Sequence, residues 1–279
     1  MQLEHFSNGW VTPVLAYLMS FIGSVLGLRC AVRARSSEQA GGWLVAAAVA
    51  LGGAGIWVMH FTAMLGFSIG GATIRYDMPL TLLSAAIAIV VVLIGLAIAV
   101  RGHREAIALP LGGSITGIGV AAMHYLGMAA MNSGVSMEYG TGLVLLSLLI
   151  AVVAATAALW FMLHVKGWAN TIGAALIMGV AVCGMHYTGM AAMSAHHGDH
   201  DMTSVPEGVA PVELLTPLLT TVALVVVGLV VLVGVAELEV RSTAAANPER
   251  ESGDGDTLTT DPATLAVSGR EWPRQRADW

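Results

Sequence analysis

Three copies of a short motif recur along the chain and carry its clearest chemical potential. They read Met59-His60-Phe61-Thr62, Met123-His124-Tyr125-Leu126 and Met185-His186-Tyr187-Thr188. The histidines are 64 and 62 residues apart, and each lies inside an apolar stretch. An imidazole is costly inside a bilayer and usually marks a functional site there. Imidazole beside thioether sulfur is a donor set that suits a soft metal, above all copper.

Further methionines follow each histidine at helical spacing. Residues four and seven positions after a histidine share its face of a helix. They would lie about 6 and 10 Å above it. The spacing therefore predicts a ladder of thioethers from the outer surface down to an imidazole, reduced in the first copy where Phe67 replaces the outer methionine. The methionine that precedes each histidine could reach a neighbouring helix. The predicted metal ligands are Met59, His60, Met64, Met123, His124, Met128, Met131, Met185, His186, Met190 and Met193.

Simpler interpretations exist for the same residues. Methionine commonly fills gaps in a core, and a lone buried histidine is often only hydrogen-bonded to the backbone. Three matching copies, with eight of the 15 methionines in motif positions, favour ligation. Tyr125 and Tyr187 could donate to a ligand or to a group around the site, or simply pack, since Phe61 stands in the first copy. Cys183 is expected to pack as a small residue.

A segment after the third motif is rich in possible metal ligands. It contains His196, His197 and His200 together with Asp199 and Asp201. We expect it on the external side, where it could hand a metal to the ladder. The alternative is a solvated acidic loop.

The composition is that of an integral membrane protein. Hydrophobic residues make up 56% of the chain and charged residues only 11%, and the mean hydropathy is +0.77. A helix needs roughly 20 apolar residues to cross a bilayer, and continuous apolar runs favour helices over strands. Seven such runs are predicted, at about 10–31, 43–69, 80–100, 108–131, 142–163, 169–193 and 214–236.

Basic residues predict the orientation, because they mark cytoplasmic loops. Arginines or a lysine follow the first, third and fifth runs, whereas the alternate loops are poor in them. The N-terminus is therefore expected outside and the C-terminus inside. The motif helices, at 43–69, 108–131 and 169–193, would then be parallel, with each motif near the outer end.

The repeat predicts an all-α fold of three two-helix repeats plus one extra helix. Each repeat is 62–64 residues long, and a pseudo-threefold arrangement around the histidines is our interpretation. Residues 1–236 would form the membrane domain. Residues 237–279, rich in small, polar and charged residues, would form a disordered cytoplasmic tail, too short for a kinase or cyclase domain.

Several function classes lack support in the sequence. It has no phosphate-binding loop, nucleophile elbow or paired general-base carboxylates, and no acidic residue within the apolar runs, so neither an enzyme nor a carboxylate proton relay is expected. No nucleic-acid partner is expected. Cys30 and Cys183 lie in different runs, which gives no basis for a disulfide.

These motifs resemble those of the MHYT domain, a bacterial integral membrane sensor module named after Met-His-Tyr-Thr. The third copy matches in full, and the resemblance covers roughly residues 10–236. It implies a copper site formed by motif Met and His residues and a role in sensing oxygen, carbon monoxide or nitric oxide. Members of the family often carry cyclase, phosphodiesterase, kinase or DNA-binding output domains, none of which is expected in this chain.

The leading hypothesis is a copper-binding sensor of a diatomic gas or of redox state. It would lie in the bacterial plasma (inner) membrane and signal through a partner protein. One alternative is copper uptake, storage or delivery to a membrane enzyme. Haem binding through paired histidines ranks lower, because haem does not need so many thioethers. A purely structural membrane subunit is the remaining alternative.

Overall fold

The computed structural model describes residues 3–4, 6–70, 72–196 and 206–246. Residues 1–233 form one compact unit, and the second unit begins at Gly234. The first unit contains the three motifs.

Seven helical spans among the described residues are long and apolar enough to cross a membrane. They confirm the seven predicted runs, and their orientation in the membrane remains a prediction. Their bounds are α1 Val11–Ser36; α2, η1 and α3, which together span Ala40–Met64; α4 Met78–Arg101; α5 Glu105–Ala129; α6 Thr141–His164; α7 Trp168–Ala191; and α8 Pro211–Ala246.

The span that carries the first motif is not one regular helix. It comprises α2 (Ala40–Ala48), the π-helix η1 (Val49–Val58) and α3 (Met59–Met64). Glycines in η1 bring backbones into direct contact: a Cβ on Gly23 of α1 would lie 2.3 Å from the amide nitrogen of Gly55, and one on Gly52 would lie 2.6 Å from the carbonyl oxygen of Ala88 in α4. π-Helical turns are rare and often lie at functional sites. Here the π-helix ends directly before the motif.

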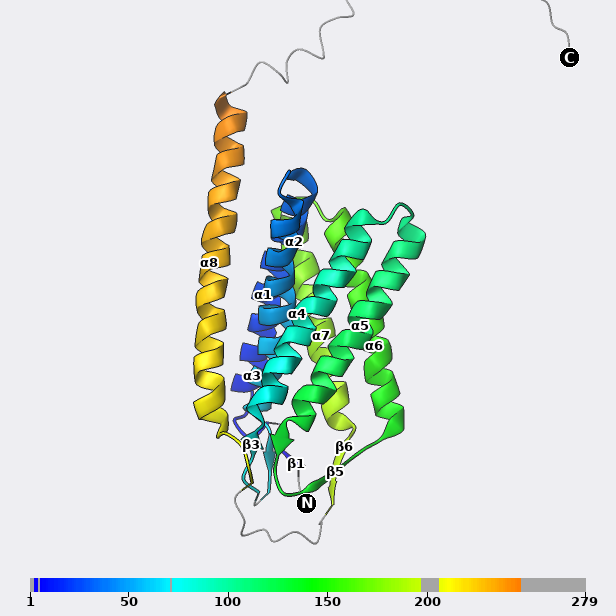
Figure 1. Cartoon of the computed structure of the whole chain (residues 1–279), viewed down its shortest axis with the longest axis vertical. Coiled ribbons are helices and arrows are strands. Elements are labelled where there is room, and N and C mark those ends of the chain that lie inside the picture. Colours follow the sequence, from blue (N-terminus) through cyan, green and yellow to red (C-terminus); the bar gives the residue numbers. More distant parts are fainter. Residues whose placement is uncertain (1–2, 5, 71, 197–205, 247–279) are drawn as a thin grey trace, which may run out of the picture. The chain divides into compact units, whose positions relative to one another are not determined.

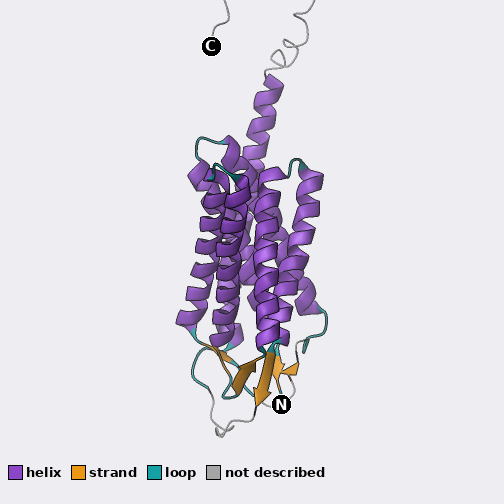
Figure 2. Cartoon of the chain, turned by 90° about the vertical axis from the view of Figure 1, so that its right-hand side faces the viewer, coloured by secondary structure: helices purple, strands orange, loops and turns teal. Residues whose placement is uncertain are grey.

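Three small antiparallel pairs of strands close the same end of the unit, where the motif helices end. The pairs are β1 (Leu3–Glu4) with β2 (Ser68–Ile69), β3 (Arg75–Tyr76) with β4 (Met131–Asn132), and β5 (Ser136–Tyr139) with β6 (Met193–His196). Figure 1 shows the first unit's helices running side by side, and Figure 2 shows the strands gathered at one end. These short strands were not predicted from the sequence.

The strand pairs reveal a threefold plan. The carbonyl six residues after each motif histidine, in Gly66, Ala130 and Ala192, accepts a backbone hydrogen bond of 2.8–2.9 Å. The donors are the amides of Ser7, Asp77 and Gly140, which precede α1, α4 and α6. Each repeat is therefore a strand, two helical spans and a closing strand, which fixes all three motifs at one level. The helix α8 follows as the extra element.

Local sequence explains where these helices begin. Asp77 caps α4, because its Oδ1 accepts from the amide of Leu80 at 2.8 Å, and Pro79 follows at the start of the helix. Gly167 precedes α7 with a φ of 77°, a conformation that favours glycine.

The last helix extends beyond its predicted end. α8 continues to Ala246, past the boundary placed at 236, so residues 237–246 are helical and not part of a disordered tail. The rest of the expected tail, 247–279, lies outside the described residues.

Candidate metal centre

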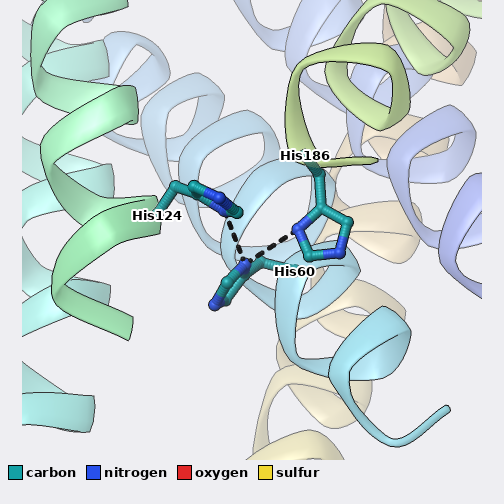
Figure 3. A group of neighbouring side chains, drawn as sticks. All are labelled: His60, His124 and His186. Carbon is teal, nitrogen blue, oxygen red and sulfur yellow. Dashed lines mark hydrogen bonds between the residues drawn. The ribbon is translucent and has the colours of Figure 1, made fainter. Parts of the chain in front are cut away.

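The three motif histidines meet inside the first unit. His60 comes from α3, His124 from α5 and His186 from α7, and Figure 3 shows their rings pointing toward one another. The Nδ1 atom of His60 lies 3.0 Å from Nδ1 of His186 and 3.1 Å from Nδ1 of His124. All three side chains are at most 1% exposed. They form a candidate metal-binding group, with ligand atoms within 4.8 Å of one another.

The rings are arranged edge to face around a centre. Their centroids are 5.0–5.1 Å apart and their planes are inclined by 80–87°. Each pair therefore directs nitrogen atoms inward instead of stacking. We refer to His60, His124 and His186 as the histidine triad.

Two glycines make this convergence possible. A Cβ on Gly127 of α5 would lie 2.6 Å from Nε2 of His60, and one on Gly189 of α7 would lie 2.4 Å from Nε2 of His124. Each glycine stands three residues after a motif histidine, and Ala63 occupies the same place in the first copy. The ring of one repeat therefore packs on the bare backbone of the next. The sequence shows a glycine at both positions but not the imidazole contact that requires it.

The triad's geometry fits a single metal ion. An imidazole nitrogen lies about 2.0–2.1 Å from a bound zinc ion. Three such nitrogens in a trigonal plane would be about 3.5 Å apart by the same distances. The observed 3.0 and 3.1 Å need only a small outward movement of the rings. Neutral imidazole suits copper, zinc, iron and nickel, so the donor set alone does not select one metal.

The outer nitrogens of two rings lack partners. Among the described residues, no hydrogen-bond partner is found for the buried Nε2 atoms of His60 and His124. Ligating histidines usually donate their second N–H to an acceptor. Here that nitrogen faces a glycine, so packing, and not a hydrogen bond at Nε2, holds the outer side of the ring.

The predicted motif methionines are all buried, but they do not form one helical ladder. The helices α5 and α7 end at Ala129 and Ala191, so Met131 and Met193 lie in strands β4 and β6. There they pair with Tyr76 and Tyr139. The helical face expected from the seven-residue spacing therefore ends before it reaches Met131 and Met193. The six other predicted methionines are buried, as are Phe67 and Trp57 of the first copy. These methionines are Met59, Met64, Met123, Met128, Met185 and Met190.

The methionines are also not equivalent to one another. Met59 packs in a small cluster with Ala16 and Ala63, against Cys183 and Tyr187. Met64, Met123, Met128, Met185 and Met190 belong to the main core. Ligation by any of these sulfurs remains a proposal.

The two motif tyrosines make different contacts. The hydroxyl of Tyr125 lies 2.6 Å from the hydroxyl of Ser147 on α6, which itself donates to the carbonyl of Val144. Tyr187 packs against Phe6, and its buried hydroxyl has no hydrogen-bond partner within the described part of the chain. In the first copy Phe61 stands at this position, and Trp57, one turn earlier, donates from Nε1 to the hydroxyl of Ser84 at 2.9 Å. The contact between Tyr125 and Ser147 therefore links α5 to α6.

The expected external metal loop cannot be placed at the triad. His197 and His200 lie outside the described residues, and His196 is described only as the end of strand β6. Cys183 is a free thiol, half-buried, and does not belong to the candidate metal group.

Comparison with known proteins agrees with this architecture. The chain matches the sequence profile of MHYT, described as "Bacterial signalling protein N terminal repeat", at residues 53–111, 117–175 and 179–246. Each matched copy contains one motif. No solved structure matches the chain significantly.

The curated relatives are larger signalling proteins. A bifunctional diguanylate cyclase/cyclic di-GMP phosphodiesterase, MucR, of Pseudomonas aeruginosa is 40% identical over 184 residues, covering 64% of this chain and 26% of the relative. The cyclic di-GMP phosphodiesterase NbdA of the same organism is 38% identical over 168 residues, covering 58% and 20%. The signaling protein YkoW of Bacillus subtilis is 32% identical over 167 residues, covering 55% and 20%. The matched part of this chain therefore spans about a quarter or less of each relative.

Proposed function

Because the chain belongs to the MHYT family of bacterial signalling repeats, we propose that it is a membrane sensor whose histidine triad binds a single copper ion. The ion would leave a position open for a small ligand such as oxygen, carbon monoxide or nitric oxide. The observation that carries the proposal is the convergence of three buried imidazoles from three repeats. A bacterial inner-membrane location follows from the family and from the seven spans.

Copper is favoured over other ions by the surroundings of the triad. Thioether sulfur is a soft donor that selects copper(I). Met64, Met128 and Met190 each lie four residues after a histidine, are buried, and are the sulfurs on the histidine's own helical face. A hard ion such as magnesium would need oxygen donors.

Haem is poorly supported by the same geometry. A porphyrin must lie between its axial ligands, whereas the triad rings lie 5.0–5.1 Å apart and are backed by Gly127 and Gly189. A bare ion needs no such space.

The chain's own residues provide a route from ligation to helix movement. Each ring of His60 and His124 sits on the backbone of the following repeat at Gly127 and Gly189. When bound, copper would supply a centre that coordinates the gas. A ring that leaves or joins that centre must move against its glycine, and this changes the spacing of α3, α5 and α7. Such a two-state packing change is a plausible signal to a partner protein.

Metal analysis of the purified protein tests the proposal. We expect about one copper per chain after loading with copper(I), and loss of that copper in the triple variant His60→Ala/His124→Ala/His186→Ala. His164→Ala is the matched control, because His164 is exposed at the end of α6 and lies beside Glu105 at the start of α5, 19 residues before His124. Equal copper in the triple variant would refute the site.

A spectroscopic measurement separates sensing from copper handling. Nitric oxide or carbon monoxide should perturb the spectrum of the copper-loaded protein if the site senses gas. Copper that binds without any such response would instead favour uptake, storage or delivery. Signalling through a separate partner is part of the proposal, since the relatives named above are signalling proteins.

A further inference from the structure

An apolar cavity lies inside the first unit, next to the histidine triad. Its lining includes Ile56, Val120 and Val182, each of which stands four residues before a motif histidine. In α5 and α7 this spacing is one helical turn on the histidine's own face. Met185, the neighbour of His186, also lines it. The cavity therefore begins one turn from the triad, on the side away from the strands.

The size and lining of the cavity define what it can hold. Its volume is about 40 Å³, and one water needs roughly 10–15 Å³ on the same measure. Water also needs two to four polar partners. The lining offers one polar side chain, Thr116, whose hydroxyl already donates to the carbonyl of Val91 at 3.2 Å. Apolar cavities of this kind stay dry and accept xenon or small apolar molecules.

The cavity reaches toward the lipid-facing side of the unit between α6 and α7. Ala154 and Ala158 of α6 and Ala181 of α7 line it and are only half-buried, whereas Ala155 is buried. Only 17% of the residues in the most apolar window of α6 are fully buried. At this edge the cavity is bordered by small alanine side chains, and the apolar interior of a bilayer concentrates apolar solutes.

We propose that this cavity binds a small, uncharged, apolar molecule, of the size of a dissolved diatomic gas, which enters from the bilayer between α6 and α7. Binding at the cavity needs no metal. Its use as an antechamber to the triad rests on the proposed function. A gas would then reach the triad from the middle of the membrane, whereas the methionine spacing predicts that a metal arrives from the external side.

Xenon binding to the metal-free protein tests the cavity directly. In xenon NMR of the detergent-purified wild type, we expect a saturable shift, and in a xenon-pressurised crystal, xenon density bordered by Ile56, Val120 and Val182. Ala155→Leu fills the cavity and should abolish the saturable shift. Ala157→Leu is the matched control on the same helix, because Ala157 does not line the cavity, and it should bind xenon as the wild type does.

Three results would overturn the proposal. They are no saturable xenon site in the wild type, equal xenon binding by a folded Ala155→Leu variant, or crystal density for water or a detergent chain in the cavity. The wild-type measurements decide the matter even if Ala155→Leu does not fold.

A second measurement tests the link to the triad. Saturating xenon should slow the reaction of nitric oxide with the copper-loaded protein several-fold, and Ala155→Leu should slow it without xenon. An unchanged rate in both would refute the antechamber. If copper does not bind at all, the proposed function fails while the xenon result stands by itself.

Discussion

Substituting Gly189 by alanine tests whether the bare backbone of α7 holds His124 in position. A Cβ at this position would lie 2.4 Å from Nε2 and 2.9 Å from Cδ2 of His124. Ordinary contact between such atoms is about 3.5 Å, so the ring must retreat by about 1 Å. Metal–ligand distances tolerate only about 0.2 Å. The displaced ring would therefore no longer ligate an ion at the centre of the triad.

The expected losses of copper affinity and of stability can both be estimated. Changes to groups that orient a ligand typically weaken metal binding about 10- to 100-fold, which is about 1.4–2.8 kcal/mol. Overpacking costs a further ~1–3 kcal/mol of stability. Alanine's better helix propensity offsets about 1 kcal/mol of that cost. The variant should therefore remain folded while its copper affinity falls.

Gly184→Ala is the matched control. Gly184 lies in the same helix, and a Cβ there would have no heavy atom within 4 Å. The Gly184→Ala variant gains the same helix propensity without contacting the triad, so its copper affinity should equal that of the wild type. The assay is competition for copper(I) against a chromophoric chelator, with thermal unfolding followed in parallel. Wild-type affinity in a folded Gly189→Ala variant would show that His124 does not need this position to bind metal.

Further substitutions test the supports around the site. Tyr125→Phe removes a hydroxyl that bonds Ser147 and should cost about 1 kcal/mol in thermal unfolding, whereas Tyr187→Phe should cost less, because its hydroxyl has no partner among the described residues; equal losses would contradict the assigned contacts. Asp77→Ala removes the cap of α4 and should lower stability by about 1 kcal/mol without changing copper stoichiometry, as metal analysis of the same sample would check.

The helical spans were predictable because a bilayer leaves the backbone few choices. Every backbone polar group in hydrocarbon must be satisfied within its own segment, so each apolar run becomes a helix. The convergence of His60, His124 and His186 was predictable for a related reason. Nearly equal spacing over an even number of helices places the three motifs at one level of the bundle. Neither inference required knowledge of any long-range contact.

The features that escaped prediction depend on such contacts. The end of α5 at Ala129 is set by pairing of Met131 with Tyr76, a partner far away in sequence. The helical spacing of Met131 therefore predicted the wrong geometry. The π-helix before His60 follows from backbone contacts of Gly52 and Gly55 with neighbouring helices. A glycine-rich run alone fits either a π-helix or an α-helix.

Proton counting within the triad gives an independent argument for a cation at its centre. A neutral imidazole has one N–H donor and one acceptor nitrogen. The Nδ1 atom of His60 is within 3.1 Å of two other Nδ1 atoms, yet it can form a good hydrogen bond with only one of them. The other contact is then left without a proton or lone pair of its own, which is costly in a low-dielectric interior. An ion that accepts all three lone pairs removes that conflict. A metal-free crystal structure should therefore show at least one of these two Nδ1–Nδ1 distances lengthened, and both distances unchanged without an ion would contradict this reasoning.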